Sequence, residues 1–419
     1  MLQRTFLPRL NWKLWFSTLP QVDWFLFLLV VGISAFGGLM IRSTELHEAS
    51  IDWWQHWIFG AVGTVIALLL ARWRYEFLMQ WHWVTYTITN LSLITVIIIG
   101  VTANGAQSWI NIGGFNVQPS EFAKVGLIIS LAALLHQKPA TTLPNVFRVL
   151  GVTVVPWVLI MLQPDLGTGL VFAAITLGML YWANINPGWL ILMLSPLISM
   201  FAYNLLFPAW IVWAMAMGII AWLTLPLRFL SAIGAILANF AAGKLSGIMW
   251  NLLKDYQKDR FTSFLDPEKD PLGAGYQLLQ SRIAIGSGEL WGRGLFNGTQ
   301  TQLNFIPEQH TDFIFSSVGE EFGFVGSIAV LLGFWLICWR LLVIALKAKE
   351  NFGSLLAIGV LSMIAFQVVL NISMTVGLAP ITGIPLPWMS YGRSALLTNF
   401  IALGLVESVA NYRPRKRLY

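Results

Sequence analysis

The sequence has little charge and a single cysteine. Only 11% of its 419 residues are charged and 57% are hydrophobic, whereas about a quarter of the residues in a soluble domain carry charge. One cysteine cannot pair within the chain, so Cys338 excludes an internal disulfide, and its apolar surroundings suit a small buried side chain. This composition excludes a soluble globular protein and indicates a membrane protein.

Motifs of several common enzyme classes are also missing. Neither G-x-x-x-x-G-K-[ST] nor G-x-G-x-x-G is present, so no nucleotide cofactor is expected. There is no D-x-D motif typical of soluble sugar-nucleotide enzymes, no zinc spacing among the five histidines and no serine nucleophile elbow. The net charge of +6 is scattered among loops without interleaved aromatic residues, so no nucleic acid partner is expected.

Apolar runs of about 20 residues, long enough to cross a bilayer, recur along almost the whole chain. The 21 tryptophans are typical of aromatic belts at the membrane surfaces. We expect an all-α polytopic membrane protein of a single domain, residues 1–419. Its twelve predicted spans are roughly 24–41, 55–72, 82–101, 121–136, 148–163, 168–184, 188–207, 208–224, 228–252, 318–345, 354–378 and 385–411. No cleavable signal peptide is evident, so the first apolar run is expected to be retained.

The distribution of basic residues predicts the orientation of these spans. With residues 1–22 in the cytoplasm, most of the 25 Lys and Arg residues fall in predicted inside segments. Six others lie in the long loop 253–317, and loops of about 60 residues or more translocate regardless of charge. Both termini are therefore expected in the cytoplasm and the loop 253–317 outside. Within this loop, Leu278–Ile285 is predicted to form a short amphipathic helix.

The polar segment 297–323 stands out in this apolar chain. Asp312, Glu320 and Glu321 lie within ten residues, and Gln309 and His310 precede them. A carboxylate at the membrane surface costs free energy to desolvate, which favours a functional role. We predict that Asp312 is a general base or a metal ligand. The alternative is an acid that stabilises the start of the following helix through the helix dipole.

Two further polar motifs lie at the outer ends of predicted spans. Glu121 and Lys124 are i, i+3 neighbours on one helix face. They form either a structural ion pair or a site in which Glu121 orients Lys124 toward an anionic ligand. Asp165 lies between Pro164 and Gly167, where it is expected either to cap the next helix or to line the same outer cavity as Asp312.

The last span begins with a segment rich in proline and glycine, Thr382–Ser394, which is not expected to be a plain helix. Non-helical backbone at membrane depth is tolerated where it lines a cavity or is buried in protein. Arg393 in this segment either holds a phosphate bidentately or extends to the membrane surface. Carboxylates, a lysine and an arginine at one end of a bundle suit a lipid-linked, pyrophosphate-bearing substrate at the outer leaflet.

These motifs resemble those of the SEDS family (shape, elongation, division and sporulation), the membrane glycosyltransferases that polymerise peptidoglycan. The segments Asn297–Gln300, Phe305–Glu308 and His310–Phe313 resemble the rod-elongation branch more than the division branch. The resemblance extends over most of the chain and also includes Trp109–Asn111, Gln118–Lys124, Gln163–Gly169, Phe264–Pro267, Asp270–Gln277 and the start of the last span.

The resemblance implies that Asp312 is the catalytic aspartate, which helps to activate the acceptor hydroxyl of lipid II, with a divalent cation (Mg or Mn) held at Asp312 as a tentative expectation. Lys124 and Glu121 match the family's helix pair, and Asp165 its second acid; Gln309, His310 and Arg393 are further candidate substrate contacts. The implied partners are lipid II, a lipid-linked glycan chain, a class B penicillin-binding protein (a transpeptidase), the elongation machinery and membrane lipids. The implied location is the bacterial plasma membrane.

The chain departs from the family pattern in two places. Residues 187–253 have room for three spans where the ten-span family pattern has one, which predicts a two-span insertion. Arg393 replaces a glycine of the common motif, so it inherits no family role. Two other functions fit the sequence: a lipid II flippase, because twelve spans and an intramembrane ion pair suit a transporter, and a structural scaffold for wall synthesis.

Overall fold

The computed structural model describes residues 21–45, 53–103, 106–267, 270 and 273–413. In this part of the chain, eleven helices are long and apolar enough to cross a membrane, and α8 is an apolar helix of 17 residues. The expected all-α membrane fold is confirmed, with twelve helices at the predicted places. They are α2 (Trp24–Thr44), α3 (Trp53–Arg72), α5 (His82–Ile99), α6 (Pro119–Gln137), α7 (Leu143–Leu162), α8 (Leu166–Trp182), α9 (Pro187–Leu205), α10 (Phe207–Thr224), α11 (Arg228–Leu252), α15 (Ile314–Leu346), α16 (Asn351–Val376) and α17 (Arg393–Asn411).

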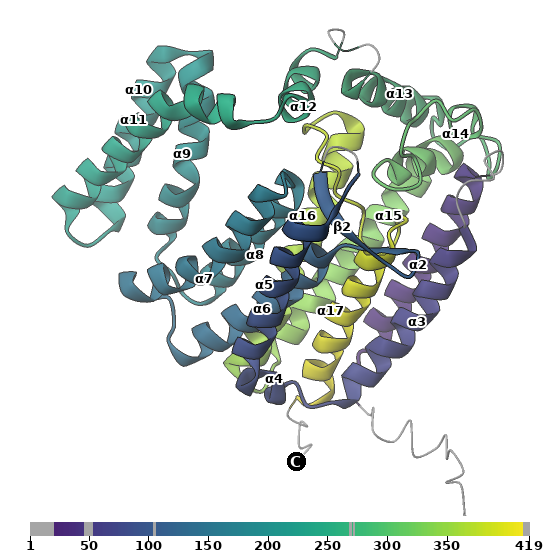
Figure 1. Cartoon of the computed structure of the whole chain (residues 1–419), viewed down its shortest axis with the longest axis horizontal. Coiled ribbons are helices and arrows are strands. Elements are labelled where there is room, and N and C mark those ends of the chain that lie inside the picture. Colours follow the sequence, from purple (N-terminus) through teal and green to yellow (C-terminus); the bar gives the residue numbers. More distant parts are fainter. Residues whose placement is uncertain (1–20, 46–52, 104–105, 268–269, 271–272, 414–419) are drawn as a thin grey trace, which may run out of the picture.

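Helices α6, α16 and α17 form the centre of the main bundle (Figure 1). The apolar window of α6 is 89% buried and that of α17 is 83% buried, whereas α7 at the periphery has 28%. A membrane helix buried on all sides contacts other helices instead of lipid, so its polar residues can face protein. This position explains how α6 carries Glu121 and Lys124 at membrane depth.

Helices α9, α10 and α11 pack mainly on one another and make only a small contact with α8 (Figure 1). Polar contacts join them: the Asn239 amide donates to Ser195 Oγ (3.0 Å), and Trp210 Nε1 donates to Ser199 Oγ (2.9 Å). Hydrogen bonds of this kind hold helices together where no water competes. The predicted two-span insertion falls in this three-helix unit, and its status as an insertion stays a prediction.

The two described ends of the chain lie at the same end of the bundle. Gln21 N donates to Asn411 Oδ1 (3.3 Å), and Arg413 Nη2 donates to Gln21 O (3.2 Å). The long loop lies at the opposite end, where it forms three helices, α12 (Asp255–Leu265), α13 (Ala274–Ser287) and α14 (Thr299–Gln302) (Figure 1). The predicted short helix is part of α13. The cytoplasmic placement of the termini remains a prediction.

The sequence did not predict α12 or a small antiparallel sheet between α5 and α6. The sheet has the order β1 (Val101–Ala103), β2 (Ala106–Ile112) and β3 (Phe115–Val117). Gly113 and Gly114 have φ of +60° and +86°, a conformation that suits the tight turn of a two-residue hairpin. Strands this short give only a weak alternating pattern beside long apolar runs. A five-residue helix, α4 (Glu76–Gln80), precedes α5.

Candidate functional site

The segment that carries Asp312 is held between α15 and the segment that precedes α17. Asn371 on α16 donates its amide both to Asp312 O and to Ile384 O, each at 2.8 Å. Tyr391 N donates to His310 O at 2.9 Å. The segment 377–392 contains no helix, as its prolines and glycines predicted. These bonds bring residues about seventy positions apart to one place at the end of the bundle opposite the described chain ends.

The Asp312 carboxylate is distinct among the acids of segment 297–323. Among the described residues, none makes a hydrogen bond or an ion pair with its side chain. The N-cap residue of the following helix, α15, is Phe313, and it makes no side-chain capping bond. The pKa of Asp312 is raised to about 7, mainly by burial and also by the charges of Glu308 and Asp165, while the charge of Arg260 lowers it. A carboxylate with a pKa near 7 is well matched to proton transfer at neutral pH.

Two other acids of that segment, Glu320 and Glu321, stabilise the loop. Glu320 accepts from the backbone N of Gln300 (2.8 Å) and of Thr301 (2.9 Å) at the start of α14. Glu321 accepts a short hydrogen bond from the Ser43 hydroxyl on α2. Both side chains are fully buried, so they act as internal acceptors that fasten the loop to the bundle. Of the three acids, Asp312 is the one whose side chain makes no hydrogen bond to other described residues.

Gly383 approaches both Asp312 and Arg260 closely. Its φ is +73°, a region that L side chains rarely adopt. A Cβ at this position would lie 3.4 Å from Asp312 Oδ2 and 3.5 Å from Arg260 Nη1. Glycine therefore leaves open the space into which the carboxylate and the guanidinium converge.

Arg260 was missed by the sequence analysis, which counted it among the six basic residues of the translocated loop. Its helix, α12, places Tyr256 and Arg260 at i, i+4, and the guanidinium lies 5.6 Å from the centre of the Tyr256 ring. The four-residue spacing of a tyrosine and an arginine is visible in the sequence and could have indicated this contact on a helix. The hydroxyl of Tyr256 and the amide of Gln257 donate to Pro164 O, which fixes α12 beside Asp165.

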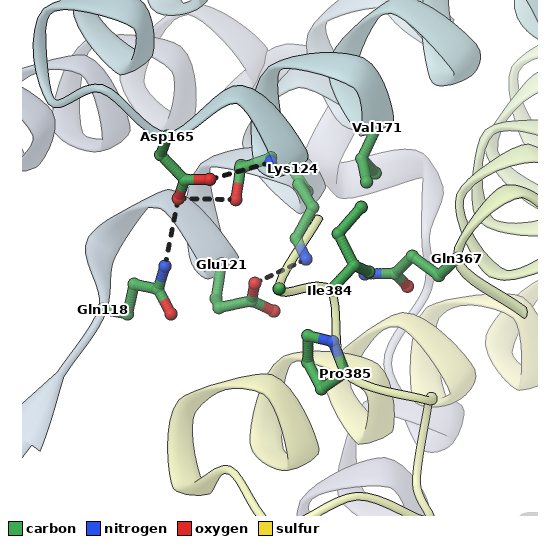
Figure 2. Close-up of a pocket in the computed structure, with 10 residues that line it drawn as sticks. Gln118, Glu121, Lys124, Asp165, Val171, Gln367, Ile384 and Pro385 are labelled. Atoms are coloured by element: carbon green, nitrogen blue, oxygen red, sulfur yellow. Dashed lines mark hydrogen bonds and ion pairs between the residues drawn. The ribbon is translucent and has the colours of Figure 1, made fainter. Parts of the chain in front are cut away.

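A polar cavity of about 40 Å³ adjoins this point, between α6, α8, α16 and the loop before α17 (Figure 2). It has room for at least one water-sized group. Its lining unites the predicted Glu121, Lys124 and Asp165 with residues that the sequence analysis did not name as site residues. The full lining is Gln118, Glu121, Lys124, Asp165, Thr168, Val171, Gln367, Gly383, Ile384 and Pro385.

Glu121 and Lys124 form a buried ion pair in the wall of this cavity. Lys124 Nζ lies 2.7 Å from Glu121 Oε1, and the two residues are 1% and 3% exposed. Figure 2 shows the lysine amine and the glutamate carboxylate pointing toward each other within the cavity. Glu121 Oε2 and Gln367 Oε1 have no hydrogen-bond partner among the described residues. An unpaired buried acceptor costs free energy. A polar ligand that donates to these two oxygens would therefore be stabilised in the cavity.

Asp165 caps the next helix, which was one of its two predicted roles, and a cavity that it shares with Asp312 stays a prediction because Asp312 is not in the lining. Its carboxylate caps α8 by accepting from Thr168 N (2.9 Å) and Thr168 Oγ1 (2.8 Å), and it also accepts from the Gln118 amide (3.3 Å). The same side chain lines the cavity. Figure 2 shows the contact between Asp165 and Gln118 at the start of α6.

Gln309 lies inside the loop and does not line the cavity. Its amide donates to Thr44 O and Thr301 O (3.1 Å each) and to Asn304 Oδ1 (2.6 Å). The side chain is 5% exposed. These contacts give Gln309 a bracing role between α2 and the loop, and the predicted contact with substrate stays a prediction.

His310 and Arg393 meet at Tyr391, away from the cavity lining. The His310 ring stands edge to face with the Tyr391 ring at 5.8 Å. Arg393 Nη2 donates to Tyr391 Oη (3.4 Å), and its guanidinium lies over the Phe115 ring at 5.4 Å. The predicted substrate contacts of these two residues also stay predictions.

The described residues contain no group of three His, Cys, Asp or Glu side chains that could hold a metal ion. A closed metal cage, such as a structural zinc or calcium site, does not fit the donor set found here. Magnesium is commonly held by one or two carboxylates, with waters and substrate phosphates as its other ligands. Asp312 suits that second arrangement.

The fold and the site define a class of protein: a polytopic membrane protein with an unpaired carboxylate, a guanidinium and a buried lysine–glutamate pair at one end of its bundle. The family model described as "Cell cycle protein", of the FtsW, RodA and SpoVE proteins, matches residues 19–210 and 189–415. The chain belongs to this family, as its motifs predicted.

Two curated relatives match most of the chain. RodA of Treponema pallidum, named a peptidoglycan glycosyltransferase, is 33% identical over 92% of this chain and 97% of that protein. The peptidoglycan glycosyltransferase MrdB of Escherichia coli K12 is 35% identical over 84% of each chain. The expectation of an enzyme of this kind is confirmed by these names.

Solved structures agree with the fold. A chain from a study of how polymerization and crosslinking are coordinated in a peptidoglycan synthase complex has a TM-score of 0.71 and 27% identity, and the match covers 94% of this chain and all of that chain. The crystal structure of RodA from Thermus thermophilus has a TM-score of 0.63 and 25% identity, with coverage of 94% and 99%.

Proposed function

We propose that this protein polymerises lipid II into glycan strands at the outer face of the bacterial plasma membrane, with Asp312 as its catalytic base. The observation that carries the proposal is the Asp312 carboxylate, which lies beside the polar cavity, has no partner among the described residues and has a pKa of about 7. The names of the curated relatives support this reaction.

In the proposed reaction, Asp312 accepts the proton of the 4-hydroxyl of the acceptor lipid II GlcNAc. The oxygen attacks the anomeric carbon of MurNAc at the lipid-linked end of the growing chain and forms the new glycosidic bond. The bond between that carbon and the pyrophosphate oxygen breaks, and undecaprenyl pyrophosphate leaves with the electron pair. The proton stays on Asp312 until solvent removes it, so the carboxylate is ready for the next acceptor.

The remaining predicted site residues act on binding in this proposal. Lys124 faces the anionic part of a substrate, and Glu121, 2.7 Å away, orients the buried amine. Asp165 shapes the cavity by fastening α6 to α8 through Gln118 and Thr168. A divalent cation, Mg or Mn, would be held at Asp312 and would supply charge stabilisation to the leaving pyrophosphate. No nucleotide takes part.

We further propose that the protein works in cell elongation and rod shape, with both termini in the cytoplasm. The elongation role rests on motifs, since the relatives also include sporulation and division proteins, stage V sporulation protein E of Bacillus subtilis and FtsW of Trichlorobacter lovleyi. A class B penicillin-binding protein and the elongation machinery are the proposed partners. The likeness to a chain of a peptidoglycan synthase complex supports the transpeptidase.

The test is polymerisation of lipid II by the purified protein in detergent, with and without its transpeptidase partner. We expect glycan strands, resolved by length on a gel, because a polymerase needs no second compartment. A flippase makes no glycan in micelles. Folded protein that yields none with the partner present would reject the polymerase and favour the flippase.

The pH dependence of this activity provides a second test. Because Asp312 must be ionised to accept a proton, kcat/KM should fall below an apparent pKa of about 7, by tenfold per pH unit. The charge of Glu308 raises the pKa of Asp312, so Glu308→Gln should move the acid limb to lower pH. Glu289→Gln, an exposed acid in the same long loop, is the matched control. An acid limb that stays in place in Glu308→Gln would contradict the assignment.

A further inference from the structure

We propose that Arg260 binds the pyrophosphate of the lipid-linked glycosyl donor beside Asp312. The inference rests on the proposed function for the identity of the donor and adds a residue that neither the motifs nor the relatives assign. It begins from the convergence at Gly383, where Asp312 Oδ2 and Arg260 Nη1 come within 3.4 and 3.5 Å of the same point. The base and the guanidinium therefore approach the same face of Gly383.

Arg260 is the cation of the site that has no acid as a partner. Within the described ranges, it makes no ion pair with Asp312 or any other acid. Lys124, by contrast, is bound to Glu121 and 1% exposed. Arg393 is turned toward Tyr391 and Phe115. A planar guanidinium presents two parallel donors that match phosphate oxygens, which a lysine amine cannot do.

One contact of Arg260 itself and three contacts of its neighbours on α12 position the arginine without using its donors. The face of its guanidinium lies over the Tyr256 ring at 5.6 Å. Tyr256 is tied to Pro164 O through its hydroxyl. On the next position of α12, Phe261 lies 6.5 Å from both Trp250 of α11 and Phe201 of α9, measured between ring centres. The arginine is thus preorganised, which lowers the entropy lost when an anion binds.

The location also suits the reaction. The bond that breaks joins the anomeric carbon to a pyrophosphate oxygen, so negative charge grows on that group as Asp312 takes the acceptor proton. A cation held beside the base stabilises this charge where it develops.

The test measures binding separately from catalysis. Farnesyl pyrophosphate is titrated into the purified full-length protein in detergent, with farnesol, inorganic pyrophosphate and phosphatidylglycerol as comparison ligands. We expect saturable binding of farnesyl pyrophosphate that Arg260→Gln weakens by about tenfold or more, the value of a charge-assisted hydrogen bond. Farnesol binding should not change. Lys258→Gln on the same helix, which removes only an exposed pair with Asp255 at 3.5 Å, should bind as the wild type does.

Arg260→Lys separates charge from geometry and serves if the glutamine variant does not fold. It keeps the charge but not the fork, so we expect a several-fold loss of affinity for farnesyl pyrophosphate, with the melting temperature unchanged. Wild-type affinity in a folded Arg260→Gln protein would overturn the inference. So would equal competition by phosphatidylglycerol, because the site would then be one for phospholipid head groups.

The outcome is independent of whether the polymerase proposal holds. If the wild type makes glycan but Arg260→Gln binds farnesyl pyrophosphate normally, the polymerase stands and the Arg260 site falls. If the wild type makes no glycan but pyrophosphate binding depends on Arg260, the Arg260 site stands and the polymerase falls.

Discussion

Replacing Asp312 by Asn or Ala should abolish glycan synthesis while the protein stays folded. The loss is expected to be about 10²- to 10⁴-fold in kcat, the typical contribution of a positioned acid or base. Asp312 makes no side-chain bond to other described residues, and neutralising it removes a carboxylate that burial and two neighbouring acids disfavour. The variant should therefore melt at the wild-type temperature or above it. Initial rates of lipid II polymerisation and thermal melting check both statements.

Asp259→Asn is the matched control for this experiment. Asp259 is an exposed acid on α12, one residue from Arg260, and the same acid-to-amide change there should leave the rate near that of the wild type. If Asp312→Asn retains the wild-type rate, the catalytic base lies elsewhere, and Asp165 and Glu121 are the next acids to test. A fall in rate accompanied by a fall in melting temperature would point to a structural role for Asp312.

Breaking the Glu121–Lys124 pair should have the largest effect on stability. Either Glu121→Gln or Lys124→Met leaves one uncompensated charge at a site that is at most 3% exposed. Loss of one partner of a buried pair costs about 3–5 kcal/mol. We expect both single variants to melt well below the wild type and to make no glycan. Thermal unfolding in one detergent, with polymerisation measured below the melting temperature, provides the data.

The double variant Glu121→Gln/Lys124→Met distinguishes the two roles that the sequence left open. Removal of both charges leaves no unpaired ion, so stability should return to near the wild type. If the pair is only structural, glycan synthesis returns as well. If Lys124 binds the substrate, the double variant is stable but inactive, which is the result we expect from its place in the cavity wall. Recovery of full activity would rule out substrate binding by Lys124.

The membrane fold was largely predictable because hydropathy is a local property. The twelve spans, the long loop and the non-helical start of the last span all appeared in the sequence at nearly the right residues. Each of these depends on side chains within about twenty positions. The small sheet and α12 were missed because short elements beside long apolar runs leave little periodic signal.

The roles of individual polar residues were harder to predict. Asp165 caps α8 as predicted, and it also lines a cavity, but Asp312 is not part of that lining. Gln309 was predicted to touch the substrate, yet its amide donates to three groups of the protein. Glu320 and Glu321 resemble Asp312 in sequence context, but their partners on α14 and α2 make them structural. Hydrogen-bond partners distant in the chain made these distinctions.

By itself, the sequence determined that this protein is a polytopic membrane protein with acids and cations at the ends of particular spans, because apolar length and charge act locally. Only the tertiary structure decided which of them meet. Arg260 and Asp312 converge at Gly383 because α12 is tied to Pro164 and Asn371 joins the backbone at Asp312 to the backbone at Ile384. These contacts span up to about 120 positions, and helix packing, which no single segment encodes, brings them together.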